Sequence, residues 1–260
     1  MAQALVFPQV VAHRGASAVA AEHTAEAYQS AIDSGAEALE CDVRLTADGH
    51  LVLVHDPRID RTSTGRGRVS NQTLEQLQEH NFGSWWDPQN PGEGEILTLD
   101  DLLELTTGAD RPIDLAIETK HPTRYGGYTE QVLVRTLERH GLSDGKGVRV
   151  MSFAAIALRR MRELAPQVPT VYLMDKVPML QRVGQLPFGA QIAGPSIDVL
   201  RSEPVMVRRW RSDGYRIHVW TVDTAEDVRF CMSERVDAII TNHPREVLTW
   251  RDEVWRELQS

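Results

Sequence analysis

Short apolar runs alternate along the chain with longer stretches whose apolar residues recur every three or four positions. The short runs are typical of buried β-strands, and the longer spacing is typical of helices that bury one face. The predicted strands are Val10–Gly15, Ala38–Val43, Ile113–Lys120, Val148–Phe153, Thr170–Met174, Gln191–Pro195, Arg216–Val222 and Ala238–Asn242. The predicted helices are Thr24–Ser34, Leu99–Thr107, Tyr128–His140, Ala155–Leu164, Met179–Val183, Glu203–Ser212, Ala225–Ser233 and Arg245–Leu258.

Eight strand–helix units in 260 residues predict an α/β fold, a TIM (β/α)8 barrel formed as one domain over residues 1–260. A doubly wound open sheet is the alternative, although it usually has five or six such strands. Residues 57–97 interrupt the rhythm with many glycines and prolines, so we expect a loop-rich insertion after the second strand. Within it, the pair Trp85–Trp86 either packs the insertion down, which is favoured, or caps a site.

A β-hairpin is predicted around Asp48-Gly49, because alternating apolar strands flank this turn dipeptide. With Asp48 and Gly49 as a two-residue loop, Asp42 pairs with His55, and Glu40 shares their face. A three-residue loop with a bulge at Gly49 would shift the register and turn His55 to the other face. The hairpin is thus expected to gather two carboxylates and an imidazole.

Acidic residues converge at the ends of the predicted barrel strands, where the chemistry of such barrels takes place. Glu40, Asp42 and Glu118 are expected to share a space too small for three uncompensated charges. A divalent cation would neutralise them, and all-oxygen ligands favour Ca²⁺ or Mg²⁺. A network of ion pairs is the alternative that the sequence leaves open; its cations would be Arg14, Arg44 and Lys120.

Two histidines and two cations fall near the same strand ends. His13 and His55 are candidates for the general acid and base, since imidazole titrates near neutral pH. Arg14 and Lys120 are suited to charge-assisted contacts with a phosphate group. Together with a metal ion, these side chains predict phosphoryl-transfer chemistry. His218, by contrast, is expected to be an interior residue with satisfied hydrogen bonds.

The net charge and the composition limit the kinds of partner and the cellular location that are expected for this chain. A net charge of −9 argues against nucleic-acid binding, which needs a basic face, but a local cation cluster can still bind an anion. The two cysteines, Cys41 and Cys231, form no disulfide framework, and Cys41 is expected to pack in the core. No signal peptide and no long apolar run are evident, so a cytoplasmic protein without stable membrane insertion is expected. A homodimer is one assembly left open.

The order of the polar motifs resembles that of the glycerophosphodiester phosphodiesterases, over nearly the whole chain. The combination of the first motif with the hairpin is highly specific. The segments that carry the resemblance are His13-Arg14-Gly15, Glu22-His23-Thr24, Glu40-Cys41-Asp42 continuing through Asp48-Gly49 to His55-Asp56, Glu118-Thr119-Lys120, and Val219-Trp220-Thr221-Val222-Asp223.

The resemblance implies a barrel with an insertion after the hairpin, and hydrolysis of glycerophosphodiesters such as glycerophosphocholine or glycerophosphoethanolamine to sn-glycerol 3-phosphate and an alcohol. It also implies roles for individual side chains. These are metal binding for Glu40, Asp42 and Glu118, acid–base catalysis for His13 and His55, phosphate binding for Arg14 and Lys120, and a wall for glycerol or the alcohol from Phe153 and Trp220.

One position departs from the family pattern. The family commonly has Glu-Asn-Thr where this chain has Glu22-His23-Thr24. An asparagine side chain both donates and accepts, whereas each nitrogen of a neutral histidine does one or the other. His23 is therefore expected either to orient a catalytic group from a different geometry or to lose that role. Glu22 is expected to support Arg14 or the loop of His13.

Other functions remain as alternatives. A phospholipase D-like enzyme or a lysophospholipid phosphodiesterase on the same barrel would need a membrane-docking surface, which the sequence does not show. A barrel that binds phosphodiesters without cleaving them would lack a catalytic group. An aldolase-like barrel would need a Schiff-base lysine, and the neighbouring Glu118 is expected to keep Lys120 charged.

Overall fold

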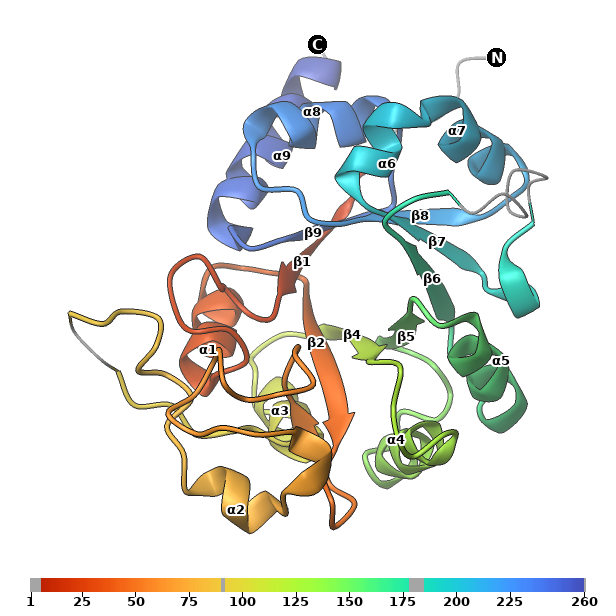
Figure 1. Cartoon of the computed structure of the whole chain (residues 1–260). Coiled ribbons are helices and arrows are strands. Elements are labelled where there is room, and N and C mark those ends of the chain that lie inside the picture. The colour runs from red at the N-terminus through yellow and green to blue at the C-terminus, as the bar shows by residue number, and fades with distance from the viewer. Residues whose placement is uncertain (1–5, 90–91, 178–184, 260) are drawn as a thin grey trace.

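Eight parallel strands close into a barrel in the computed structural model, which describes residues 6–89, 92–177 and 185–259 (Figure 1). The barrel closes because β1 pairs with β2 on one side and with β9 on the other. This closure confirms the TIM barrel and excludes the open sheet. The barrel strands are β1 (Gln9–His13), β2 (Ala38–Leu45), β4 (Asp114–Thr119), β5 (Val148–Ser152), β6 (Thr170–Met174), β7 (Ile192–Pro195), β8 (Arg216–Val219) and β9 (Ala238–Thr241).

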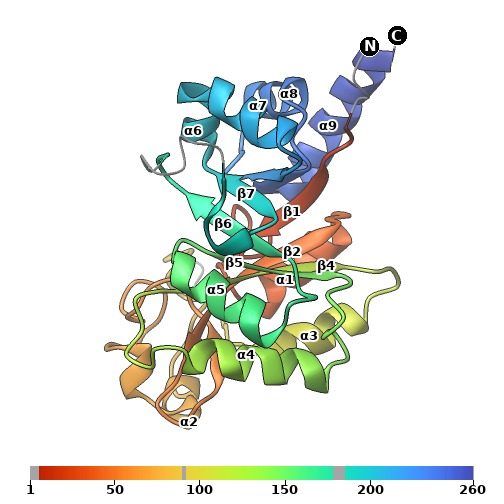
Figure 2. The ribbon, with the colours of Figure 1, turned by 90° about the vertical axis from the view of Figure 1, so that its right-hand side faces the viewer.

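Helices surround the strands on the outside of the barrel (Figures 1 and 2). They are α1 (Ala25–Asp33), α2 (Leu74–Gln78), α3 (Leu99–Thr107), α4 (Tyr128–Arg139), α5 (Ala155–Leu164), α6 (Ile197–Ser202), α7 (Pro204–Ser212), α8 (Ala225–Ser233) and α9 (Pro244–Gln259). Thr98 and Thr224 cap the N-termini of α3 and α8. The helix predicted over Met179–Val183 lies outside the described residues. Helix α6 was not predicted, although Ser196 is a good N-cap whose hydroxyl accepts a hydrogen bond from the Val199 amide.

The strands divide their side chains between two sides, as a period of two requires. On β2, Leu39, Cys41 and Val43 are fully buried in the layer between the strands and the helices. The intervening Glu40 and Asp42 therefore face the inside of the barrel. The inner apolar layer comes from Val11, Ala38, Ala116, Met151, Val171, Leu173, Ile192, Ala238 and Ile240. This alternation delivers carboxylates to the interior without interrupting the outer core.

The insertion has a core of its own, which corrects the prediction of turns and loop over residues 57–97. It contains a 3₁₀ turn, η1 (Val69–Asn71), and the short helix α2, which begins with a capping box between Thr73 and Gln76. The pattern Thr-x-x-Gln was the sequence signal for this helix. An apolar cluster fixes these pieces against the hairpin; its buried members are Val52, Val54, Ile59, Val69, Leu77, Phe82 and Ile96.

The hairpin has the shifted register, so the predicted two-residue turn is wrong. Strand β3 (Leu51–Leu53) is antiparallel to β2, with Val43 opposite Leu53. The Thr46 amide donates to the His50 carbonyl at 2.9 Å, which leaves three residues in the loop. Gly49 has a φ of +92°, and this left-handed conformation favours glycine. The loop length was decided by this backbone conformation, which the sequence pattern did not determine.

The new register places Val54 opposite Asp42, because the Val54 amide donates to the Asp42 carbonyl at 3.1 Å. His55 consequently does not pair with Asp42 across the hairpin. It follows the end of β3, where its carbonyl accepts hydrogen bonds from Arg44 Nε at 3.0 Å and Nη2 at 2.6 Å. The chain turns at this point, and the His55 side chain still reaches a cavity that Glu40 and Glu118 also line.

None of the helices within the described residues is long and apolar enough to cross a bilayer.

Candidate active site

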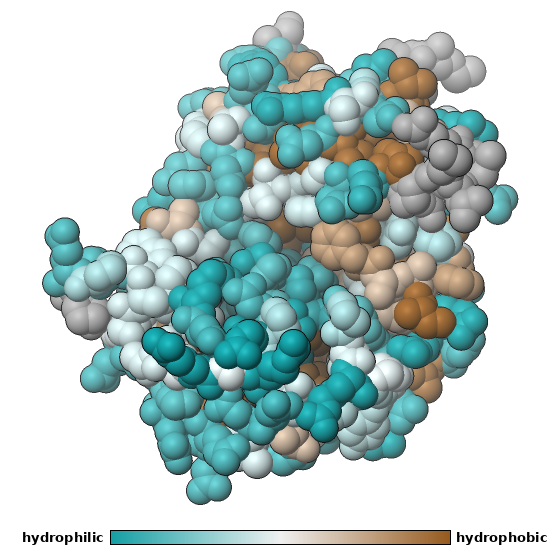
Figure 3. Space-filling view, in the orientation of Figure 1, coloured by the Kyte–Doolittle hydropathy of each residue, from teal (hydrophilic) through white to brown (hydrophobic). Residues whose placement is uncertain are grey.

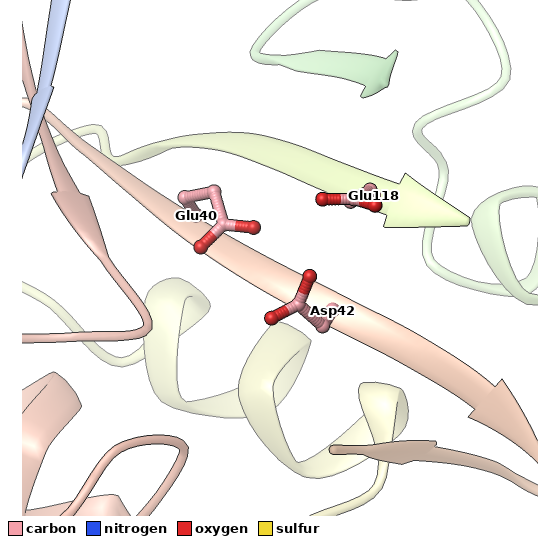
Figure 4. Close-up of side chains that lie close together, drawn as sticks. All are labelled: Glu40, Asp42 and Glu118. Carbon is pink, nitrogen blue, oxygen red and sulfur yellow. The ribbon is translucent and has the colours of Figure 1, made fainter. Parts of the chain in front are cut away.

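Three carboxylates meet inside the carboxyl end of the barrel (Figure 4). Glu40 and Asp42 come from β2 and Glu118 from β4, where Glu118 is the register partner of Asp42. One oxygen from each lies within 4.8 Å of the others, and all three side chains are buried. The structure thus brings together the three predicted metal ligands.

Two cations contact these carboxylates. Lys120 Nζ lies 2.8 Å from Glu118 Oε1 and 3.3 Å from Asp42 Oδ1. Arg14 Nε lies 3.1 Å from Asp42 Oδ2, and the Arg14 amide donates to Glu40 Oε2 at 3.0 Å. Arg44 takes no part in this set, contrary to the ion-pair alternative, because its guanidinium bonds to the His55 carbonyl.

The cations do not neutralise the cluster completely. Burial and then the charge of Asp42 raise the pKa of Glu118 to about 8, and the same two causes hold the pKa of Glu40 well above its usual range. Asp42 Oδ1 is buried and lacks a hydrogen bond within the described residues. A divalent cation would supply positive charge and use this oxygen, so the oxygen-donor set fits a hard metal ion.

Hydrogen bonds through Asn242 and Asp223 hold the His13 ring, and neither residue was predicted to belong to the site. Asn242 Nδ2 donates to Asp223 Oδ2 at 2.6 Å, which turns Asn242 Oδ1 toward His13 Nδ1 at 2.8 Å. The hydrogen-bond network therefore places the His13 proton on Nδ1 and leaves Nε2 as an acceptor. Burial, followed by the charge of Arg14, lowers the pKa of His13 to about 4. The positions of Asp223 and Asn242 after two barrel strands were the available signal.

His55 has a carboxylate partner instead. Its Nδ1 lies 2.8 Å from Asp56 Oδ1, and Arg61 Nε donates to Asp56 Oδ2 at 2.6 Å. Arg61 also donates to both carboxylate oxygens of Glu22, at 2.8 and 2.9 Å. Glu22 in turn accepts from Arg14 Nη1 at 3.1 Å, as its predicted supporting role requires. Arg61 thus links the insertion to both the His55 and the Arg14 sides of the site.

The contacts of His23 and Trp85, next to the carboxylates and Arg61, bear on two of the predictions made from the sequence. His23 Nε2 lies 3.0 Å from Asp42 Oδ2, and its Nδ1 lies 2.8 Å from the Tyr28 hydroxyl. His23 adopts a φ of +63°, a conformation in which asparagine is enriched. The Arg61 guanidinium lies 5.7 Å from the centroid of the Trp85 ring, which agrees with the packing role for Trp85, whereas Trp86 is exposed.

The remaining predicted residues line one cavity of about 130 Å³. Phe153 and Trp220 stand edge to face with ring centroids 5.3 Å apart and form an apolar wall. Trp220 is fixed by a hydrogen bond from Nε1 to the Gly194 carbonyl at 2.8 Å. The polar lining of the cavity comes from His13, Arg14, Glu40, His55, Glu118 and Lys120.

Several known proteins are similar to this chain in sequence or in fold. A Mycobacterium tuberculosis protein named probable glycerophosphodiester phosphodiesterase 1 is 44% identical over 255 residues, covering 95% of this chain and 93% of its own. A glycerophosphodiester phosphodiesterase of Bacillus subtilis is 32% identical, covering 90% of this chain and 83% of its own. The solved structure of an Oleispira antarctica phosphodiesterase in complex with the product sn-glycerol-3-phosphate shares the fold, with a TM-score of 0.81, 24% identity, and coverage of 95% of this chain and 97% of that one.

The sequence profile of the Glycerophosphoryl diester phosphodiesterase family matches residues 13–246. The match includes every barrel strand from β2 to β9, the insertion and the cavity described above. This chain belongs to the glycerophosphoryl diester phosphodiesterase family.

Proposed function

We propose that this enzyme hydrolyses glycerophosphodiesters, such as glycerophosphocholine and glycerophosphoethanolamine, to sn-glycerol 3-phosphate and an alcohol in a reaction that depends on Ca²⁺ or Mg²⁺. The observation that carries the proposal is one cavity lined by two histidines, two cations and the carboxylates of Glu40 and Glu118, with the buried Asp42 completing the carboxylate cluster. A cation-binding carboxylate cluster next to arginine and lysine suits an anionic phosphorus centre.

Glu40, Asp42 and Glu118 would hold the metal ion. When bound, the ion polarises a phosphate oxygen and offsets negative charge as the transition state forms. Arg14 and Lys120 bind the other phosphate oxygens, since both face the same cavity and carry a permanent charge. Phe153 and Trp220 form the wall for the glycerol or alcohol part, because they supply the aromatic side of the cavity.

The two histidines differ in their partners, and this difference suggests their roles. His13 pairs with a neutral amide and is stable as a neutral imidazole, so its Nε2 accepts the proton of the attacking hydroxyl. Burial lowers the pKa of His55 as well, but the hydrogen bond to the Asp56 carboxylate opposes this shift, so His55 is the better candidate to donate a proton to the departing alcohol. With water as the nucleophile, one P–O bond forms as the bond to the alcohol breaks, which gives sn-glycerol 3-phosphate directly. With the glycerol 2-hydroxyl as the nucleophile, the same displacement gives a cyclic phosphate, and water then opens the ring as the P–O bond to the 2-oxygen breaks.

Release of glycerol 3-phosphate from purified enzyme tests the proposal. We expect turnover of glycerophosphocholine, its loss in excess EDTA, and its recovery with added Ca²⁺ or Mg²⁺. Full activity in EDTA would overturn metal dependence. Cleavage of a long-chain lysolipid in preference to glycerophosphocholine would favour the lysophospholipid alternative. The cytoplasmic location and the homodimer stay predictions.

A further inference from the structure

A second cavity, of about 240 Å³, adjoins the catalytic one, and Lys120 lines both. Its walls come from the end of β2, the turn η1 and the loop after β4. In the barrel, β4 lies between β5, which precedes Phe153, and β2, which carries Arg44. The second cavity therefore lies on the opposite side of Lys120 from the aromatic wall.

The lining of this cavity carries positive charge and no carboxylate. The cations are Arg44, Arg68, Lys120 and Arg124. Within the described residues, none of the three arginines forms an ion pair, although most of the surrounding cations do; Arg61, for example, contacts two carboxylates. Such a concentration of unmatched positive charge is unusual in a chain with a net charge of −9.

The contacts of these arginines orient them without neutralising them. Arg44 donates to the His55 carbonyl, and burial lowers its pKa although the charges of Asp42, Glu118 and Asp56 act in the opposite direction. Arg124 Nη1 donates to Asn71 Oδ1 at 2.8 Å and to the Ser70 carbonyl at 3.2 Å. Figure 3 shows that the lower half of this face, over the insertion and α4, is strongly hydrophilic. Thr129 also lines the cavity, with a buried hydroxyl that has no hydrogen-bond partner in the described part of the chain.

We infer that this basic cavity binds a second anionic group on the alcohol part of the substrate, so that the enzyme prefers glycerophosphodiesters whose alcohol carries a phosphate. The inference rests on the proposed function and specifies its substrate class. With glycerol against Phe153 and the scissile phosphate at Lys120, the alcohol extends toward the arginines. A phosphate there gains charge-assisted hydrogen bonds, whereas a cationic choline group meets like charges.

The test compares kcat/KM for three substrates that differ in the charge of the alcohol part. They are 1,3-bis(glycerophospho)glycerol, which carries a second phosphate, glycerophosphoglycerol, which is neutral there, and glycerophosphocholine, which is cationic. We expect the first to be preferred by about tenfold at low ionic strength, because its second phosphate gains charge-assisted contacts that exposure to solvent weakens only in part. Added salt should reduce this preference, because it screens partly exposed charges.

Substitutions of the lining arginines test whether the basic cavity causes the preference for the second phosphate. The double substitution Arg68→Gln with Arg124→Gln should lower kcat/KM for the bis-phosphate substrate by about three- to tenfold and leave glycerophosphocholine turnover within about twofold. Arg256→Gln, on the last turn of α9, removes one positive charge far from the insertion and is the matched control for each single arginine substitution (Figure 1). If the double variant unfolds, Arg68→Gln alone tests the point, because the exposed Arg68 side chain has no hydrogen bond or ion pair to the described residues.

Two outcomes would overturn the inference: equal kcat/KM for the three wild-type reactions, or an equal loss on all three substrates in the double variant. Failure of the proposed function gives a different result, since none of the three diesters would then release glycerol 3-phosphate.

Discussion

The two ends of the barrel both hold buried charged side chains, and they differ in how those charges are arranged. At the carboxyl end, Asp42 lies near both Arg14 and Lys120, and the carboxylate oxygens converge on one point. At the amino end, the buried Arg149 lies 4.0 Å from Asp114 and has no hydrogen bond to its Nε or Nη2 within the described residues.

Burial also disfavours the charged forms of the side chains at the amino end, but the polar atoms of these side chains do not converge on one point. Burial lowers the pKa of Arg149 to about 10, and burial followed by the Arg149 charge keeps the pKa of His218 well below its usual range. Perturbed ionisation therefore occurs at both ends, and it does not mark a functional site by itself. Convergent ligand atoms beside a solvent-accessible cavity distinguish the carboxyl end. His218 is interior as predicted, but the prediction that its hydrogen bonds are satisfied is wrong, because its Nδ1 has no partner among the described residues.

The largest expected effect is on catalysis at the carboxyl end. His13→Ala and His55→Ala should each lower kcat by about 10²–10⁴-fold, because each removes a proton-transfer group. Steady-state assays of glycerol 3-phosphate release measure the loss. His50→Ala is the matched control, since His50 lies in the exposed hairpin loop. Full activity in both site variants would remove the acid–base assignment.

Glu118→Gln should separate stability from metal binding. The metal-free variant should be more stable than the wild type near neutral pH, because the raised pKa of Glu118 shows that its ionised form is disfavoured. Thermal unfolding with and without CaCl₂ measures both properties. The wild type should gain about 2.7 kcal/mol at a Ca²⁺ concentration 100 times Kd, and the variant should lose most of this gain. An unchanged Ca²⁺ response would remove Glu118 from the metal site; Glu138→Gln on α4 is the control.

Asn242→Ala tests the positioning of His13. Without the amide oxygen, the imidazole loses the partner that fixes its tautomer, and kcat should fall by about ten- to hundredfold with little change in KM. The pH profile of kcat gives a second readout, because the environment of the His13 ring changes. A variant with unchanged kcat and an unchanged profile would show that Asn242 is only structural.

The smallest expected effect concerns the amino end. The pKa of His218 is lower in the folded state than in the unfolded state, so the unfolded chain binds more protons below about pH 6.5. Stability should consequently fall as the pH drops, by at most about 1.4 kcal/mol per pH unit from this group. Urea unfolding at neutral and mildly acidic pH should show a shallower pH dependence for His218→Leu than for the wild type. An equal slope in both proteins would contradict this account.

The barrel was predictable from sequence because eight short apolar runs alternate with helical patterns along the chain, and each run corresponds to a parallel strand. The cluster of Glu40, Asp42 and Glu118 was predictable because residues two apart on a strand share a face. The hairpin register was not predictable, since it depends on whether Gly49 adopts a left-handed conformation in a three-residue loop. The insertion was also misread, because its core combines residues that are far apart in sequence, such as Val52 and Phe82.

The site was predictable where a residue acts through its place on a strand. The partners of His13 and Asp42 were harder to find, since the hydrogen bond that Asn242 accepts and the one that His23 donates depend on side-chain orientation as well as position. Arg61 is a further example. Its role arises from the fold of the insertion, which the composition of that segment did not reveal.

The hydrogen bond between His13 and Asn242 joins residues 229 positions apart, near the two ends of the chain. The segment that closes the barrel beside β1 therefore also supplies the partner of the His13 ring. A chain cut before β9 would keep Glu40, Asp42 and Glu118 but lose the group that holds His13. Closure of the sheet and orientation of this imidazole thus depend on the same short segment.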